Sequence, residues 1–141
     1  MPITRNTDQR SKTLEQFYLE ISQEDSYSSK SLGKLMLEFL EMINHTFKET
    51  QLWGLTSLYR LVIQAENDWK SPWYIIIRAM GNEYHIEYLL PPQKSPWEGA
   101  RVVGSATSIA EVKKCLVIAM NECDGWSNNQ ELSELIEHLN D

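Results

Sequence analysis

The sequence has only two cysteines, and it has no apolar run long enough to cross a membrane. Cys115 and Cys123 fall within one predicted helix, where their separation along the axis is about 12 Å. A disulfide needs Cα atoms within about 7 Å of each other, so these two cysteines do not pair inside that helix. There is also no CxxC motif and no Cys/His set with zinc-site spacing. These absences predict no metal site and no cofactor, and they favour the reducing cytoplasm as the location.

The first residues lack the apolar stretch of a secretory signal. They read MPITRNTDQRSKT, which is polar and without periodicity. We therefore expect residues 1–12 to be a flexible tail. Residues 13–141 are expected to form a single domain, because a chain of this length is ordinary for one hydrophobic core.

Lysine and arginine are absent from residues 115–141, where six acidic residues occur. This segment therefore accounts for −6 of the net charge of −7. An acidic surface repels nucleic acid and anionic membranes, so neither is an expected partner, whereas a basic protein is. Glu131 and Glu134, in the last predicted helix, are the candidate contacts. The ordinary alternative is a solvated helix face that keeps the protein in solution.

The sequence motifs of common enzyme classes are missing. There is no phosphate-binding GxxxxGK(S/T), no GxGxxG after a strand, no GxSxG nucleophile turn and no HExxH. Of the three histidines, His45 and His138 lie near the ends of predicted helices, where surface positions are ordinary. His85 lies within a predicted strand and is the histidine with candidate polar neighbours. No catalytic residue is predicted.

Apolar residues at helical spacing predict two helices before a β region and two after it. The first stripe covers residues 14–21, and the second covers residues 32–47. The expected start and stop signals are Thr13 with Gln16 for the first helix, Ser108 with Glu111 and then Gly125 for the third, and Ser127 or Asn128 for the last.

Between the helices the apolar period changes to two, which predicts strands. The expected strands are residues 56–65, 73–80, 83–90 and, where Gly104 interrupts the pattern, 101–106. A Gly-Asn pair separates the second and third runs, as a two-residue hairpin turn requires. We therefore expect an α+β fold, in which an antiparallel meander of three to four strands has helices packed mainly on one face.

The hairpin turn fixes a register that brings polar side chains together. In that register Arg78 stands opposite His85 on the less apolar face, Glu87 is diagonal to Arg78, and Arg60 lies on a neighbouring strand. We call these four residues the polar patch. Two arginines can hold an anion, and a histidine beside a carboxylate can move a proton. Mixed charges on the solvent side of a sheet are, however, the ordinary way of pairing neighbouring strands.

Five tryptophans lie at loop or element boundaries. Trp97 follows Ser-Pro in the proline-rich loop PPQKSPWEGA, and Trp126 follows Gly125. Tryptophan is enriched at binding hot spots, so Trp97 and Trp126 are candidate contacts. The alternative is that such residues plug the rim of a small core.

These features favour a small cytosolic protein-binding module of the inhibitor or immunity type, whose partner is a basic protein such as a nuclease toxin. A first alternative is a small-molecule-binding domain or enzyme that uses the polar patch on the open face of the sheet. A second alternative, compatible with either, is a homodimer or larger oligomer that buries the apolar residues of that face, namely Leu58, Val62, Ile76 and Leu89.

Overall fold

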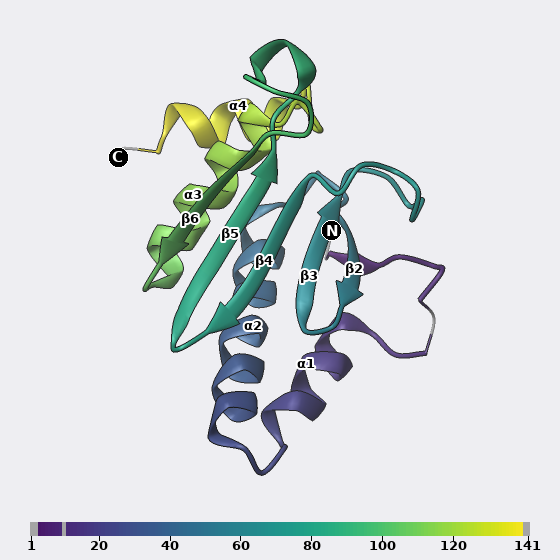
Figure 1. The fold of residues 1–141 in the computed structure, drawn as a ribbon, viewed down its shortest axis with the longest axis vertical. Helices are drawn as coiled ribbons and strands as arrows, with labels where there is room; N and C mark the ends of the chain where they lie inside the picture. Colours follow the sequence, from purple (N-terminus) through teal and green to yellow (C-terminus); the bar gives the residue numbers. More distant parts are fainter. Residues whose placement is uncertain (1–2, 10, 140–141) are drawn as a thin grey trace.

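The chain folds into two layers, a single sheet and a set of helices that covers one of its faces (Figure 1). The computed structural model describes residues 3–9 and 11–139. Within them the sheet has six strands, which neighbour one another in the order β1 to β6. The elements in chain order are β1 Thr4–Arg5, α1 Leu14–Ser22, α2 Tyr27–Thr46, β2 Trp53–Ser57, β3 Arg60–Gln64, β4 Ile75–Met80, β5 Glu83–Leu89, the 3₁₀ turn η1 Pro92–Lys94, β6 Arg101–Ala106, α3 Ile109–Glu122 and α4 Gln130–Glu137.

The predicted α+β class is confirmed, whereas the predicted meander of three to four strands is wrong. β1 precedes both N-terminal helices and pairs in parallel with β2. Ile3 and Asn6, on either side of β1, are buried. Residues 3–6 therefore belong to the sheet and the core, which differs from the loose tail predicted for residues 1–12. Residues 1–2 and 10 of that predicted tail lie outside the described residues.

The strand predicted over residues 56–65 is two strands joined by a tight turn. β2 and β3 pair antiparallel, with Ser57 opposite Arg60 across the two-residue turn Leu58-Tyr59. Leu58 has a backbone φ of 58°, a left-handed conformation that a residue with a bulky side chain rarely adopts. Leu58 is 86% exposed, so burial of its side chain does not offset the energetic cost of that backbone conformation. The turn carries no Gly or Asn, and the sequence pattern therefore fits one strand as well as two.

The hairpin of β4 and β5 has the predicted register. Gly81 and Asn82 have φ values of 62° and 61°, and a type I′ turn requires positive φ at both positions. Arg78 lies opposite His85, and Ile77 lies opposite Ile86. The strand predicted at residues 101–106 is also confirmed as β6, which pairs antiparallel with β5.

The helices begin where side chains satisfy their first backbone N–H groups. The predicted N-caps Thr13 of α1 and Ser108 of α3 each accept a hydrogen bond from the backbone three residues on. α2 begins at Tyr27, earlier than predicted, because Ser26 caps it. α4 is capped by Asn129 rather than by the predicted Ser127 or Asn128. No helix among the described residues has both the length and the apolar content needed to cross a membrane.

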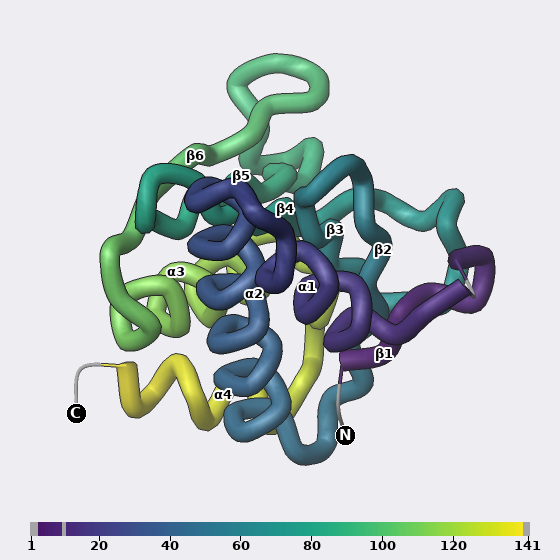
Figure 2. Tube along the Cα trace, turned by 90° about the horizontal axis from the view of Figure 1, so that it is seen from below, coloured from purple at the N-terminus to yellow at the C-terminus, as the bar shows by residue number. Residues whose placement is uncertain are grey.

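α1 and α2 lie side by side on the helical face of the sheet (Figure 2). One close approach between them is at Gly33 of α2, which is buried. A Cβ atom at this position would lie 2.4 Å from the backbone nitrogen of Ser22 at the end of α1. The missing side chain therefore allows the two helix backbones to approach each other.

The core fills the space between the sheet and the helices. Tyr18 of α1, Phe39 of α2 and Leu116 of α3 have no exposed surface. Tyr84 of β5 packs its ring 6.0 Å from that of Phe39, and its hydroxyl donates to the backbone oxygen of Leu35 at 2.7 Å. The opposite face of the sheet, which we call the open face, has no helix over it among the described residues, and Figure 1 looks onto it.

Candidate functional site

Four polar side chains form one row across the open face. The register of β4 and β5 sets Arg78 opposite His85, and that of β5 and β6 sets His85 opposite Ser105. The register of β3 and β4, continued by one step, places Arg60 beside Arg78. Opposite residues on neighbouring antiparallel strands have Cβ atoms about 5 Å apart. The row therefore runs Arg60, Arg78, His85, Ser105, and its first two members carry the same charge.

The row borders a cavity of about 270 Å³, which we call the sheet-face pocket. Ile76 lies within it and is 6% exposed, whereas Val103 is 74% exposed. The polar patch predicted from the sequence is thus brought together in one cavity. The lining residues are Arg60, Ile76, Arg78, His85, Ile86, Glu87 and Val103.

The two arginines of the pocket have no carboxylate partner among the described residues. The Nη2 atom of Arg60 donates to the Ser57 hydroxyl at 3.2 Å, but its Nε atom is buried without any hydrogen-bond acceptor. Arg78 is exposed, and no ion pair or hydrogen bond of its side chain occurs within residues 3–9 and 11–139. Two positive charges therefore stand on neighbouring strands, and neither forms an ion pair with a carboxylate of the described residues.

The carboxylates near the pocket lie beside Arg101 and His85. The Glu87 Oε2 atom lies 4.0 Å from Nε of Arg101, and the Glu83 Oε2 atom lies 3.8 Å from Nε2 of His85. Arg101 also donates to the backbone oxygen of Trp73 at 3.3 Å. Sequence reasoning did not select Arg101 or Glu83, although each is the first residue of a predicted strand. The alternation of side chains along β5 and β6 places the odd-numbered residues, Glu83 and Arg101 included, on the open face.

The lining of the pocket combines cationic, acidic and apolar side chains. None of the described lining residues carries a hydroxyl, thiol or amine group, and the hydroxyl of Ser105 lies in the row just outside the lining. His85 lies 3.8 Å from the Glu83 carboxylate and stands opposite Ser105 in the row. No group of three or more His, Cys, Asp or Glu residues in the described part of the chain has the geometry to hold a metal ion.

The apolar residues beside the pocket are covered by the chain itself. Val62, Ile76 and Leu55 form a small buried cluster on the open face, and Trp73 packs against it. Val62 has no exposed surface. Two of the residues proposed for an oligomer interface, Val62 and Ile76, are therefore already removed from water within one chain.

The two candidate tryptophans lie in different environments. Trp126 is 7% exposed, and its ring lies 5.5 Å from that of Tyr74. Asp124, with a φ of 60°, adopts the left-handed conformation expected of Gly125, while a Cβ atom at Gly125 would lie 3.0 Å from the Tyr74 ring. Trp126 is therefore part of the hydrophobic core. Trp97 is 70% exposed on the loop after η1 and borders a separate cavity of about 410 Å³.

Glu131 and Glu134, the predicted acidic contacts, also differ in role. The Glu131 carboxylate accepts hydrogen bonds from the backbone N–H groups of Lys48, Glu49 and Thr50 at 2.8, 3.0 and 3.0 Å, and from the Thr50 hydroxyl at 2.6 Å. It therefore ties α4 to the loop that follows α2. Glu134 is exposed and accepts one hydrogen bond from Gln130 at 3.2 Å.

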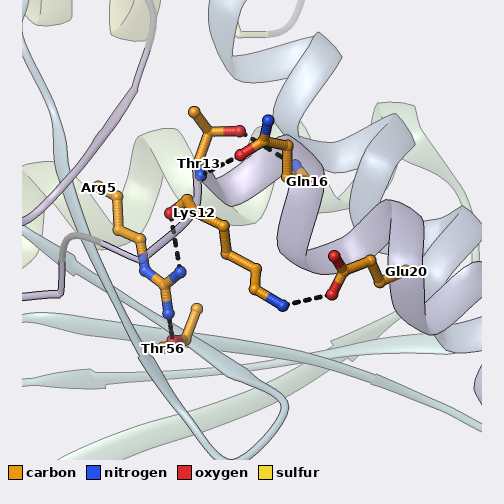
Figure 3. Close-up of polar contacts among 6 residues, drawn as sticks. All are labelled: Arg5, Lys12, Thr13, Gln16, Glu20 and Thr56. Atoms are coloured by element: carbon orange, nitrogen blue, oxygen red, sulfur yellow. Dashed lines mark hydrogen bonds and ion pairs between the residues drawn. The ribbon is translucent and has the colours of Figure 1, made fainter.

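A larger cavity, of about 570 Å³, lies beside residues 3–9 and 11–16, and several of its polar groups bond to other parts of the chain (Figure 3). Arg5 donates to the Lys12 backbone oxygen at 2.9 Å and to the Thr56 hydroxyl at 2.5 Å. Lys12 pairs with Glu20, and Thr13 bonds to Gln16 in the cap of α1. These contacts hold the segment between β1 and α1 in place, so the cations Arg5 and Lys12 already have partners within the chain.

Comparison of this chain with models of known protein families, with curated proteins and with solved structures finds no match. The functional argument therefore depends on the geometry of the sheet-face pocket.

Proposed function

We propose that the protein binds a small anionic ligand, through a carboxylate or phosphate group, in the sheet-face pocket. One observation carries this proposal: Arg60 and Arg78 stand side by side without a carboxylate partner, and the Nε atom of Arg60 is buried without an acceptor. An anion between the two guanidinium groups would provide the negative charge that the described residues do not place there.

The energetics favour a bound anion over an empty pocket. Like charges directly opposite on neighbouring strands destabilise a sheet, and a buried N–H group without an acceptor costs about 1–3 kcal/mol. A carboxylate or phosphate oxygen would relieve the repulsion, and a shift of the Arg60 side chain towards it would give the buried Nε atom an acceptor. A guanidinium group can also donate two parallel hydrogen bonds to two oxygens of one carboxylate or phosphate group.

The size of the pocket limits the ligand. Its volume of about 270 Å³ lies just below the range of about 300–1,000 Å³ that is typical of drug-sized ligands. Ile76 and Val103 provide apolar contact beside the cationic row. These features favour a compact acid with a short apolar body over an extended polyanion.

We expect Arg78→Gln to weaken binding of inorganic phosphate, or of a small dicarboxylate such as malonate, by about 10- to 100-fold, because a charge-assisted hydrogen bond contributes about 1.5–3 kcal/mol. Arg60→Lys keeps the charge but loses the Nε donor, and it should also bind more weakly. Isothermal titration calorimetry at low salt measures both effects.

Lys113→Gln is the matched control, because it removes one positive charge from the exposed side of α3, away from the open face. It should leave affinity unchanged. Equal loss in Lys113→Gln and Arg78→Gln would mean that net charge, and not the pocket, attracts the anion. Wild-type affinity in Arg78→Gln would refute the proposed site.

The hypothesis of an inhibitor of a basic protein stays a prediction, but it has less support from the described residues. Trp126 is used in the core, and Glu131 is used to hold a loop. Trp97 and Glu134 remain exposed.

We further propose the cytoplasm as the location. Cys115 and Cys123 are both free thiols. Burial raises the pKa of the Cys123 thiol to about 11, so it stays protonated and unreactive at neutral pH. Unpaired cysteines are typical of proteins in reducing compartments.

A further inference from the structure

The two edges of the sheet differ in how they are protected. β1, at one edge, has two residues and leaves little backbone unpaired. β6, at the other edge, runs for six residues. Arg101, Gly104 and Ser105 are exposed, and Val103 is 74% exposed. Natural proteins usually shorten, charge or cover such an edge, because its free N–H and C=O groups attract another strand.

The hydrogen-bond pattern identifies the free backbone groups of β6. Leu90 N–H donates to the Ala100 oxygen at 3.0 Å, so Ala100 faces β5. Partners alternate along an antiparallel ladder, and the even-numbered residues of β6 therefore turn their backbone groups towards β5. Arg101, Val103 and Ser105 turn theirs outward to the free edge.

The side chains of β6 do little to prevent pairing. The strand reads RVVGSA, without proline, lysine or an acidic residue, and its one charge, Arg101, is at its first position. On the open face the strand presents Arg101, Val103 and Ser105, because these lie opposite Leu89, Glu87 and His85 of β5. The same three residues thus carry both the outward backbone groups and the open-face side chains.

We infer that β6 pairs with β6 of a second copy of this chain, antiparallel and around a two-fold axis at Val103. In this register Val103 meets Val103 of the partner subunit, and Arg101 meets Ser105 of the partner subunit, so all three outward residues are bonded. The open faces of both copies stay on the same side, because opposite residues in antiparallel strands point to one face. No charge meets a like charge, and the exposed valines cover each other.

The pairing also extends the row of the sheet-face pocket, and this part of the inference rests on the proposed function. Within one chain the row ends at Ser105. In the dimer Arg101 of the partner subunit stands next to Ser105 on the same face, which adds a third arginine to the row that holds Arg60 and Arg78. Each subunit would then supply a cation to the outer end of the other's pocket.

Val103→Pro tests the pairing without removing a bond of the native ladder, because the N–H of Val103 faces outward and proline is tolerated at such edge positions. Light scattering after size exclusion should give twice the chain mass of 16.4 kDa for the wild type and the single mass for Val103→Pro. Val103→Thr keeps the N–H and the branched shape, and it should remain dimeric. Circular dichroism confirms that the variants fold.

Amide hydrogen exchange provides a second measurement. Arg101, Val103 and Ser105 should be protected in the wild type and lose that protection in Val103→Pro at the positions that retain an N–H, while Val102 and Gly104 stay protected in both. A monomeric wild type at its highest soluble concentration, or a dimer that survives Val103→Pro, would overturn the pairing.

Phosphate titration of the same proteins separates the two proposals. Because Val103 lines the pocket, the contribution of Arg101 of the partner subunit is measured with Arg101→Gln, made both in the wild type and in Val103→Pro. A loss of affinity at least about 3-fold larger in the dimeric protein than in monomeric Val103→Pro supports that contribution, and equal losses overturn that contribution alone. If neither protein binds phosphate or malonate, the proposed function fails, while the mass and exchange data still decide the pairing.

Discussion

Gly33→Ala should lower the free energy of unfolding by about 3 kcal/mol, the upper part of the range seen when a packed core is overfilled. The added Cβ atom would lie 2.4 Å from the nitrogen and 2.6 Å from the Cα atom of Ser22. Both are backbone atoms, so relief requires α1 and α2 to move apart. In a helix without such a contact, Gly→Ala would raise the free energy of unfolding by about 1 kcal/mol. The contact with Ser22 therefore decides whether Gly33→Ala stabilises or destabilises the protein. Urea denaturation followed by circular dichroism measures it.

Gly104→Ala is the matched control for that substitution. A Cβ atom at Gly104 would meet only the Cγ2 atom of Ile86, at an ordinary contact distance of 3.6 Å. The stability of this variant should stay within about 0.5 kcal/mol of the wild type. A Gly33→Ala protein as stable as the wild type would show that α1 and α2 do not approach each other at Gly33.

Glu131→Ala should cost about 2 kcal/mol of stability, the second large effect that we expect. The substitution removes the acceptor of three backbone N–H groups and of the Thr50 hydroxyl, and Thr50 is 5% exposed. A hydrogen bond to a charged group contributes about 1.5–3 kcal/mol when it is buried, but water can replace the more exposed bonds to Lys48 and Glu49. Glu131→Gln, which keeps one carbonyl oxygen, should cost about half as much.

The same carboxylate makes stability depend on pH. Burial would raise the pKa of Glu131, but the hydrogen bonds from Thr50 and from the backbone of Lys48 and Glu49 outweigh it and hold the pKa below its usual value. The unfolded chain therefore takes up this proton at a higher pH than the folded chain. The contribution is fully present well above the ordinary glutamate pKa of about 4.3, and it is lost as pH falls through the lowered folded value.

Glu134→Gln is the control for both measurements, because Glu134 is exposed in the same helix and bonds only to Gln130 among the described residues. Its stability should match that of the wild type within about 0.5 kcal/mol at neutral pH. In thermal melts between pH 3 and pH 7, Glu131→Gln should show a shallower acid decline than Glu134→Gln. Parallel curves for the two variants would contradict the role assigned to Glu131.

The two hairpins show what a sequence can and cannot reveal about this fold. The turn between β4 and β5 needs positive φ at two residues, and Gly81-Asn82 is a pair that adopts it readily, so turn and register are predictable. The turn between β2 and β3 uses Leu58, a residue type that gives no turn signal. Its conformation follows from the pairing of two good strands on either side, which is a tertiary effect.

The candidate site divides in the same way. Arg78, His85 and Glu87 are predictable as neighbours because period-two alternation and one fixed turn determine which side chains share a face. The bonds of Glu131 to Lys48, Glu49 and Thr50 join residues far apart in sequence, and no local pattern encodes them. From the sequence alone, the acidic residues of α4 suggest a binding surface. The structure shows that one of them, Glu131, holds the loop after α2 instead. β1 is not predictable from the sequence, because its two residues, Thr4 and Arg5, are too few to show a periodic pattern.

The parallel pairing of β1 with β2 has a consequence for the order of folding. The chain between these two strands contains all of α1 and α2, so their pairing closes a long loop, whereas β4 and β5 meet across two residues. The entropy lost on closure grows with loop length, and distant contacts form more slowly than local ones. We therefore expect β1 to dock among the last elements, so that the first strand in chain order completes the sheet.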